Sequence, residues 1–119
     1  MKDFHQLKVR EKSHQLALAI YKATKEFPKE ELYGLTSQIR RSSMSIPTNI
    51  AEGCGRNTDA DFARFLQIAM GSASETEYQL LLSCDLGFLS KDQYDKLNID
   101  TTEVKRMLAS LLKTIRTDR

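Results

Sequence analysis

The chain of 119 residues is predicted to be all-α, an antiparallel four-helix bundle with up-down-up-down order. Gly (5) and Pro (2) are scarce and Trp is absent, which disfavours a turn-rich β architecture. Apolar residues recur at steps of three and four along four segments, and short Gly- or Pro-containing stretches separate them. Short connections make consecutive helices antiparallel. We therefore expect a single domain over residues 1–119, with no repeat or linker.

The first predicted helix, about Phe4 to Lys25, carries two rows of residues at helical spacing. The row expected to face the core contains Val9, Ser13, Leu16, Ile20, Ala23 and Phe27. The row nearly opposite contains Phe4, Leu7, Glu11, His14, Leu18 and Tyr21. A helix in an isolated bundle needs only one apolar face. We therefore predict an interface between copies of the chain at Leu7, His14, Leu18 and Tyr21, the alternative being that this row only flanks the core.

The second predicted helix begins either at Pro28 or at Thr36 as an N-cap, and Gly53 ends it. Its core row contains Leu32, Leu35, Ile39, Ser43, Ile46 and Ile50. Pro47 lies inside the helix and cannot donate a hydrogen bond to the carbonyl of Ser43. A kink at Pro47 is therefore predicted.

The third predicted helix follows Thr58, a suitable N-cap. Its core stripe contains Phe62, Leu66, Ala69, Ala73, Leu80 and Cys84. A second row contains Phe65, Ile68, Ser72, Glu75, Gln79 and Leu82, so this helix also has two faces to cover.

The fourth predicted helix opens at Ser90, with Gln93 completing a capping box. Val104, Leu108, Leu111 and Ile115 form one apolar face, and Asn98 to Thr101 is a candidate interruption. The other side of the helix is basic, as expected of an outer surface.

The overall charge is only mildly basic. Lys and Arg number 18 against 16 Asp and Glu, for a net charge of +2 and a pI near 8.6. A dedicated nucleic-acid-binding domain usually has a pI above ~9. Candidate phosphate contacts are Arg41, Arg56, Lys105, Arg106, Lys113 and Arg116, and the alternative is a solvated charged surface. Symmetric assembly would sum several copies of such a patch into a stronger field.

A polar cluster is predicted between the second and third helices. Its members are Arg40, Asn49, Glu52 and Glu75. The two carboxylates stand among small or apolar neighbours, and a buried carboxylate requires a partner such as Arg40 or Arg41. The cluster would fix the helix register or the contact between subunits, unless these are solvated surface charges.

No enzyme active site is predicted. Glu11 and His14 have the Glu-x-x-His spacing of di-iron bundles, but such sites need a second step and two further carboxylates. Cys54 lies between two glycines, and no sequence pattern links it to a His or a carboxylate that could act as a base. We therefore interpret it as a reduced thiol rather than a nucleophile. We expect no cofactor and no metal. The charged N-terminus lacks a signal core and no apolar run could span a membrane, which favours the cytoplasm.

The stretch from Gln38 to Gly53, containing Ser45-Ile46-Pro47-Thr48-Asn49-Ile50-Ala51-Glu52-Gly53 and followed by Gly55-Arg56, resembles the 23S rRNA intervening-sequence proteins of bacteria. The similarity continues through Phe65-Leu66, Gly71-Ser72 and Glu75 to Met107-Leu108. It implies a four-helix bundle, commonly a homopentamer without known catalysis, encoded in sequences that interrupt ribosomal RNA genes. Relatives include the accessory protein of diversity-generating retroelements, a basic pentamer that binds nucleic acid and a reverse transcriptase. We therefore expect a homo-oligomeric accessory protein that binds RNA or DNA, the alternative being a protein-binding scaffold.

Overall fold

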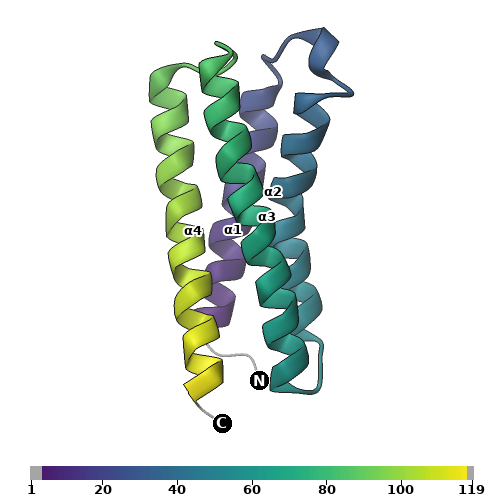
Figure 1. Cartoon of the computed structure of the whole chain (residues 1–119), viewed down its shortest axis with the longest axis vertical. Coiled ribbons are helices and arrows are strands. Elements are labelled where there is room, and N and C mark those ends of the chain that lie inside the picture. Colours follow the sequence, from purple (N-terminus) through teal and green to yellow (C-terminus); the bar gives the residue numbers. More distant parts are fainter. Residues whose placement is uncertain (1–3, 118–119) are drawn as a thin grey trace.

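The structure is a computed structural model that describes the backbone of residues 4–117 and the side chains of residue 6 and residues 8–115. The elements are α1 (Phe4–Thr24), a short 3₁₀ helix η1 (Lys29–Glu31), α2 (Leu35–Cys54), α3 (Asp59–Asp85) and α4 (Lys91–Thr117). The long helices alternate in direction, so α1 begins and α4 ends at the same end of the bundle (Figure 1). No strand occurs within residues 4–117. The predicted all-α four-helix bundle is confirmed.

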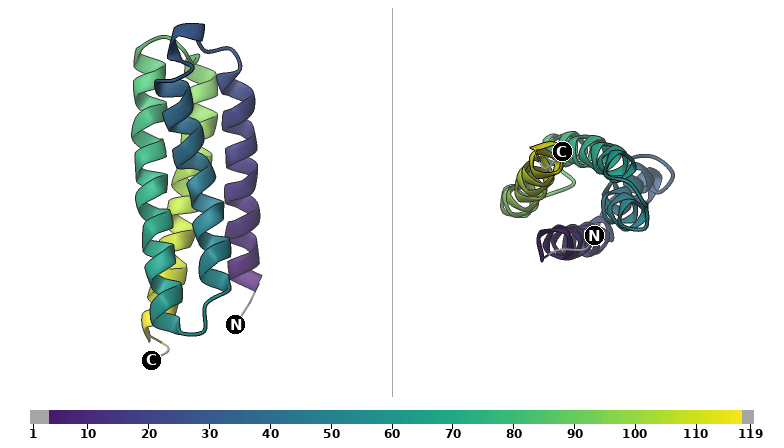
Figure 2. Two further views of the ribbon diagram at one scale, coloured as in Figure 1. Left: turned by 90° about the vertical axis from the view of Figure 1, so that its right-hand side faces the viewer. Right: turned by 90° about the horizontal axis from the view of Figure 1, so that it is seen from below.

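The four helices are arranged in a ring in chain order (Figure 2). Each helix packs against the one before and after it, and α4 closes the ring against α1. Among the described residues, no Cα atom of α1 lies within 8 Å of one in α3, and the same holds for α2 and α4. The outer surfaces of α1 and α3 therefore lie on different sides of the bundle.

Most members of the predicted apolar rows form the core, but Leu32 lies before α2 and is 48% exposed, and Leu35 and Cys84 are only half-buried. Side chains less than 2% exposed come from all four helices: Val9, Leu16, Ile20, Ile39, Ile46, Ile50, Leu66, Leu80, Val104 and Leu108. The small residues Ala69 and Ala73 are fully buried between them. None of the described helices is both long enough and apolar enough to cross a lipid bilayer.

Two of the predicted helix starts are confirmed by their caps. Thr58 Oγ1 accepts a hydrogen bond from the Asp61 N–H at 3.1 Å before α3. At the start of α4, Ser90 N–H donates to Gln93 Oε1 at 2.9 Å and Gln93 N–H donates to Ser90 Oγ at 3.1 Å. Each cap satisfies backbone donors that the first turn of a helix leaves without partners.

The predicted start of the second helix is wrong in both forms. Pro28 leads only into η1, and Thr36 lies inside the first turn of α2 rather than capping it. Glu31 takes the capping role, because Glu31 Oε1 accepts a hydrogen bond from the Leu35 N–H at 3.0 Å. Gly34 makes room for that carboxylate, since a Cβ there would lie 2.9 Å from Glu31 Oε1.

Two further details concern breaks within helices. Pro47 lies inside α2, which continues through it to Cys54, and the kink there stays a prediction. The candidate interruption at Asn98 to Thr101 is wrong, because α4 is continuous from Lys91 to Thr117. Thr101 is buried there and its hydroxyl donates to the Leu97 carbonyl at 2.8 Å, which satisfies the polar group without leaving the helix.

Candidate interaction surfaces

The residues considered for catalysis or metal binding were Glu11, His14 and Cys54. Among the described residues, no group of three or more His, Cys, Asp and Glu side chains could hold a metal ion. Glu11 and His14 are exposed on α1. Cys54 is buried beside Gln6 and Cys84 is half-buried, and neither forms a disulfide within the described part of the chain.

An apolar surface runs along the outside of α1 and α2. We call it the α1–α2 face and define it by seven residues that line a groove of about 720 Å³: His14, Ala17, Leu18, Tyr21, Met44, Pro47 and Ala51. Leu18 is 51% exposed and Met44 is 49% exposed in the single chain. The structure thus brings His14, Leu18 and Tyr21 of the predicted interface onto one surface, while their role as an interface stays a prediction.

Part of the α1–α2 face was missed by the sequence analysis. Met44, Pro47 and Ala51 come from α2 and follow one another at steps of three and four, the spacing that could have revealed them. They lie next to a row of polar residues on the same helix, Arg41, Ser45, Thr48 and Glu52, so this side of α2 was interpreted as polar. The side chain of Leu7, the fourth residue of the predicted interface, lies outside the described residues.

A pocket of about 410 Å³ continues the α1–α2 face toward the start of α2. It shares Tyr21 and Met44 with the face, and its other lining residues are Leu32, Tyr33, Thr36, Ser37, Arg40 and Arg41. Tyr33 is 92% exposed. Thr36 is buried, and its hydroxyl oxygen has no hydrogen-bond partner among the described residues. The pocket thus combines aromatic surface with polar groups whose bonding capacity is not filled.

Arg40 is held in one orientation by α1. Arg40 Nε donates to Thr24 Oγ1 at 2.8 Å, and a longer bond of 3.4 Å runs from Arg40 to the Tyr21 carbonyl. The guanidinium carbon lies 4.9 Å from the centre of the Tyr21 ring, a cation–π contact. Arg40 is half-buried, yet it forms no ion pair with any described carboxylate. A partly desolvated charge without a counter-charge is costly.

α3 exposes a second surface, on the side away from α1. We call it the α3 outer face and define it by residues at steps of three and four: Ile68, Gly71, Glu75, Tyr78 and Leu82. Ile68, Glu75 and Tyr78 are exposed, Tyr78 to 61%. The second row predicted on this helix is split, because Phe65 and Gln79 are buried while Ile68 and Glu75 face outward.

The predicted polar cluster is not assembled within one chain. Arg40 bonds to α1, and Asn49 donates to the Ser45 carbonyl on its own helix. Glu52 and Glu75 are both exposed, so neither is the buried carboxylate that the prediction assumed. Glu52 pairs instead with Arg56, one turn away, at 2.9 Å. A role of Glu75 in a contact between subunits stays a prediction.

Other polar residues join α2 to α3. Ser42 Oγ and Thr76 Oγ1 lie 2.8 Å apart, and Ser42 Oγ donates to Gln79 Oε1 at 2.6 Å, all three residues being buried. Ser72 Oγ donates to Ser45 Oγ at 2.9 Å. These pairings were not predicted from the sequence. Which hydroxyls meet depends on the relative height of the two helices. The spacing of residues along one helix contains no information on that height.

The predicted nucleic-acid contacts do not merge into one patch. Three of them pair with carboxylates of the same chain, as Arg56–Glu52, Lys105–Glu77 and Arg106–Glu103. Arg41 and Lys113 are exposed and form no ion pair with a described residue. Arg41 lies on α2 and Lys113 on α4, two helices that do not touch among the described residues. The side chain of Arg116 lies outside the described part.

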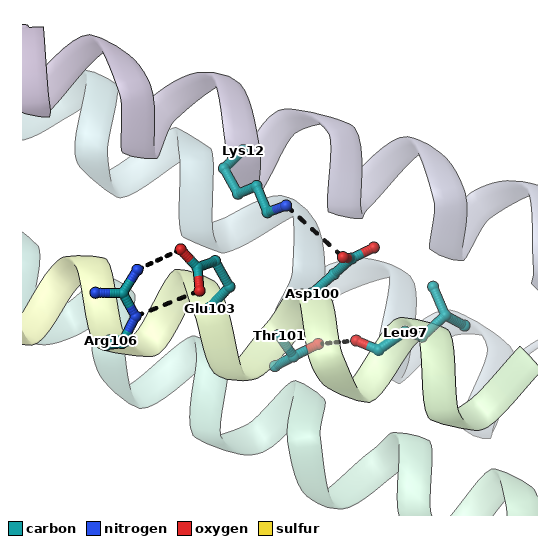
Figure 3. A network of polar contacts seen from close by, with 6 residues as sticks. All are labelled: Lys12, Leu97, Asp100, Thr101, Glu103 and Arg106. Carbon is teal, nitrogen blue, oxygen red and sulfur yellow. Dashed lines mark hydrogen bonds and ion pairs between the residues drawn. The ribbon is translucent and has the colours of Figure 1, made fainter.

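Charged residues also line the seam between α1 and α4 (Figure 3). Lys12 Nζ lies 3.7 Å from Asp100 Oδ1 across the seam, above a groove of about 690 Å³. Arg106 and Glu103 pair along α4. The hydrogen bond from Arg106 lowers the pKa of the Glu103 carboxyl below its ordinary value, and the same bond raises the pKa of Arg106.

Comparison with known proteins identifies the family. Residues 5–110 match the family model described as 23S rRNA-intervening sequence protein. Among solved structures, the chain is similar to a protein of unknown function from the S23 ribosomal protein family of Bacteroides thetaiotaomicron. The two are 34% identical with a TM-score of 0.86, over 92% of this chain and 99% of that one. Comparison with curated proteins finds no match. This chain belongs to the 23S rRNA-intervening sequence protein family.

Proposed function

We propose that this chain is a cytoplasmic, non-enzymatic assembly protein that functions as a homo-oligomer. The observation that carries the proposal is the pair of exposed apolar surfaces, the α1–α2 face and the α3 outer face, which are built from different residues of the bundle. Contiguous apolar surface of this kind marks interaction sites in soluble proteins. Two different surfaces on one chain suit a head-to-tail contact, which closes into a ring. Five subunits are expected from the family resemblance.

The test is the mass of the protein in solution, measured by light scattering over a range of concentrations. Leu18→Glu places a charge in the centre of the α1–α2 face and should shift the protein toward monomer, because a buried unpaired charge opposes association. Ile99→Glu is the matched control, since Ile99 is 67% exposed on α4 and belongs to neither face. A wild-type chain that is monomeric at every concentration would refute the proposal.

Nucleic-acid binding is the second candidate function. It is favoured by Arg41 and Lys113, which are exposed cations without an ion pair among the described residues. Each subunit of an oligomer would repeat them, and repeated weak contacts gain from avidity. Binding would then rest on phosphate contacts with little reading of base sequence.

The second function is tested by fluorescence anisotropy with a structured RNA across a salt series. Each duplex phosphate that is neutralised should contribute about −0.9 to the log–log slope. Lys113→Gln should reduce that slope, whereas Lys91→Gln should not, because Lys91 already pairs with Asp95 at 2.8 Å. Absence of binding at low salt would leave the assembly function alone.

A further inference from the structure

We infer that the α3 outer face of one copy docks on the α1–α2 face of the next, and that Glu75 of one copy supplies the carboxylate that Arg40 of the other lacks. The inference rests on the proposed homo-oligomer and names the surfaces and the ion pair of its contact. It starts from the contrast between Arg40, half-buried without a counter-charge, and Glu75, exposed at the centre of an apolar surface.

Arg40 is prepared to receive an anion. Two hydrogen bonds and the Tyr21 ring fix the guanidinium on α1, and these use only part of its five N–H donors. Thr24, which accepts the bond from Arg40 Nε, is itself buried, and its hydroxyl donates to the Ile20 carbonyl at 2.8 Å. A cation oriented by a supported partner loses little freedom when a carboxylate arrives.

Glu75 has the properties expected of a carboxylate that pairs with Arg40 of another copy. It is exposed and forms no ion pair with a described residue, and its described hydrogen bond is a long one of 3.4 Å from Gln79 Nε2. Ile68 and Tyr78 lie about two turns before and one turn after it on the same surface. Docking would therefore bury a carboxylate among apolar side chains, which requires a cation opposite it.

The two charges lie within about one helical turn of each other in height along the bundle. The bond between Ser42 and Thr76 marks one level on α2 and α3. Arg40 stands two residues before Ser42, and Glu75 stands one residue before Thr76. Since a helix rises about 1.5 Å per residue, these two positions differ in height by less than about one turn.

The apolar residues of the two faces match in height as well. Ile68 stands eight residues before Thr76, and Ala51 stands nine residues after Ser42, so in antiparallel helices both lie at one level. Tyr78 falls at the level of Arg40, beside Tyr21. A closed ring whose axis runs along the bundles joins copies without a shift in height, so residues at equal levels meet.

A phosphate group could also satisfy Arg40, together with the hydroxyl of Thr36 and the neighbouring Arg41. A phosphate would leave Leu18 and Met44 exposed to water, however, whereas the α3 outer face would cover them. The match in height and the shared apolar surface therefore favour a second copy of this chain as the occupant.

The test is a charge-reversal cycle at Arg40 and Glu75, read as the concentration at which the protein half-assembles. Glu75→Arg should raise that concentration at least about tenfold, because like charges would face each other across the contact. Arg40→Glu should do the same, and the double variant should restore most of the assembly. Ser74→Arg is the matched control, since Ser74 is exposed next to Glu75 but outside the face. Circular dichroism verifies that each variant keeps its helices.

The outcomes separate the inference from the proposed function. Wild-type protein that never assembles refutes both. Wild-type protein that assembles while Glu75→Arg has no effect overturns the inference alone. The same conclusion follows if both single variants are folded and weakened but the double variant is not restored. If Arg40→Glu loses the binding of inorganic phosphate but still assembles, the pocket at Arg40 is a phosphate site. That result also overturns the inference.

A second measurement uses the wild-type chain, in case Arg40→Glu does not fold. A zero-length carbodiimide cross-linker joins carboxylates to lysines. Glu75 lies on the outer face of α3, and no Cα atom of α1 lies within 8 Å of one in α3 among the described residues, so a product between Glu75 and Lys22, or Lys25 just after α1, is expected to join two copies. A mixture of ¹⁴N- and ¹⁵N-labelled protein should give this product with one peptide of each isotope. Assembled protein that yields only other cross-links would contradict the docking arrangement.

Discussion

The α2–α3 seam and the α1–α4 seam are built from different chemistry. α2 and α3 are joined by buried hydroxyl and amide groups, with Ser42 bonded to both Thr76 and Gln79. α1 and α4 are joined by a charged contact between Lys12 and Asp100, both partly exposed, beside an open groove.

The two kinds of contact differ in how firmly they fix the relative position of two helices. A buried hydrogen bond leaves an unsatisfied polar group if the helices slip, so it permits few registers. An exposed ion pair keeps water as an alternative partner and tolerates movement. We therefore expect substitutions in the α2–α3 seam to cost far more stability than substitutions in the α1–α4 seam.

The largest effect is expected at Gly53, where α2 packs closely against Phe62 and Phe65 of α3. A Cβ at this position would lie 2.9 Å from Phe65 Cβ and 3.0 Å from Phe62 Cδ1. Gly53→Ala should lower the free energy of unfolding by up to about 3 kcal/mol, because overpacking displaces both rings. Urea denaturation at low protein concentration measures the change.

Gly71 provides the control, since a Cβ there would meet nothing within 4 Å. Gly71→Ala should raise the free energy of unfolding by as much as about 1 kcal/mol, the usual gain on removing a glycine from a helix. Equal effects at Gly53 and Gly71 would show that the close approach of α2 and α3 does not limit stability.

A smaller loss is expected from Ser42→Ala. The change leaves the buried Gln79 Oε1 without its 2.6 Å donor and removes a partner from Thr76, which should cost about 1–2 kcal/mol. Thr48→Ala is the matched control, because the Thr48 hydroxyl also bonds to a carbonyl of its own helix but is exposed. If both substitutions cost the same, the seam is not fixed by its hydroxyl network.

The helices and their core rows could be predicted because they depend on local spacing. Val9, Ser13, Leu16 and Ile20 recur at steps of three and four and are all buried, and the caps at Thr58 and Ser90 are likewise local. The same spacing identified the second surface of α1.

Contacts between helices could not be predicted in the same way. Arg40 was expected to join a cluster with Glu52 and Glu75 between the second and third helices, but within one chain it bonds to Thr24 on the first. Its long side chain can reach either neighbour, and the choice depends on the rotation of α2 about its axis. The contribution of Met44 to the α1–α2 face was missed for the same reason. A surface formed by two helices can be predicted only if the rotation of both helices about their axes is known.

Only a slight effect is expected from the ion pair across the α1–α4 seam. Lys12 and Asp100 are separated by 3.7 Å with side chains 41% and 30% exposed. Such pairs contribute up to about 1 kcal/mol, and much of that is screened by salt. A double-mutant cycle with Lys12→Met and Asp100→Asn should give a coupling energy below that value, falling further at high salt. A larger coupling would mean that this seam is fixed as firmly as the α2–α3 seam.

The smallest expected effect concerns Glu103, which faces the same groove. The hydrogen bond from Arg106 lowers the pKa of Glu103, so the ionised form is favoured in the folded chain. The resulting stabilisation is present above the ordinary pKa of glutamate and is lost as the pH falls through the lowered value. NMR titration of the Glu103 carboxyl should return its pKa toward the ordinary value in Arg106→Gln. An unchanged pKa of Glu103 would mean that its hydrogen bond with Arg106 is absent in solution.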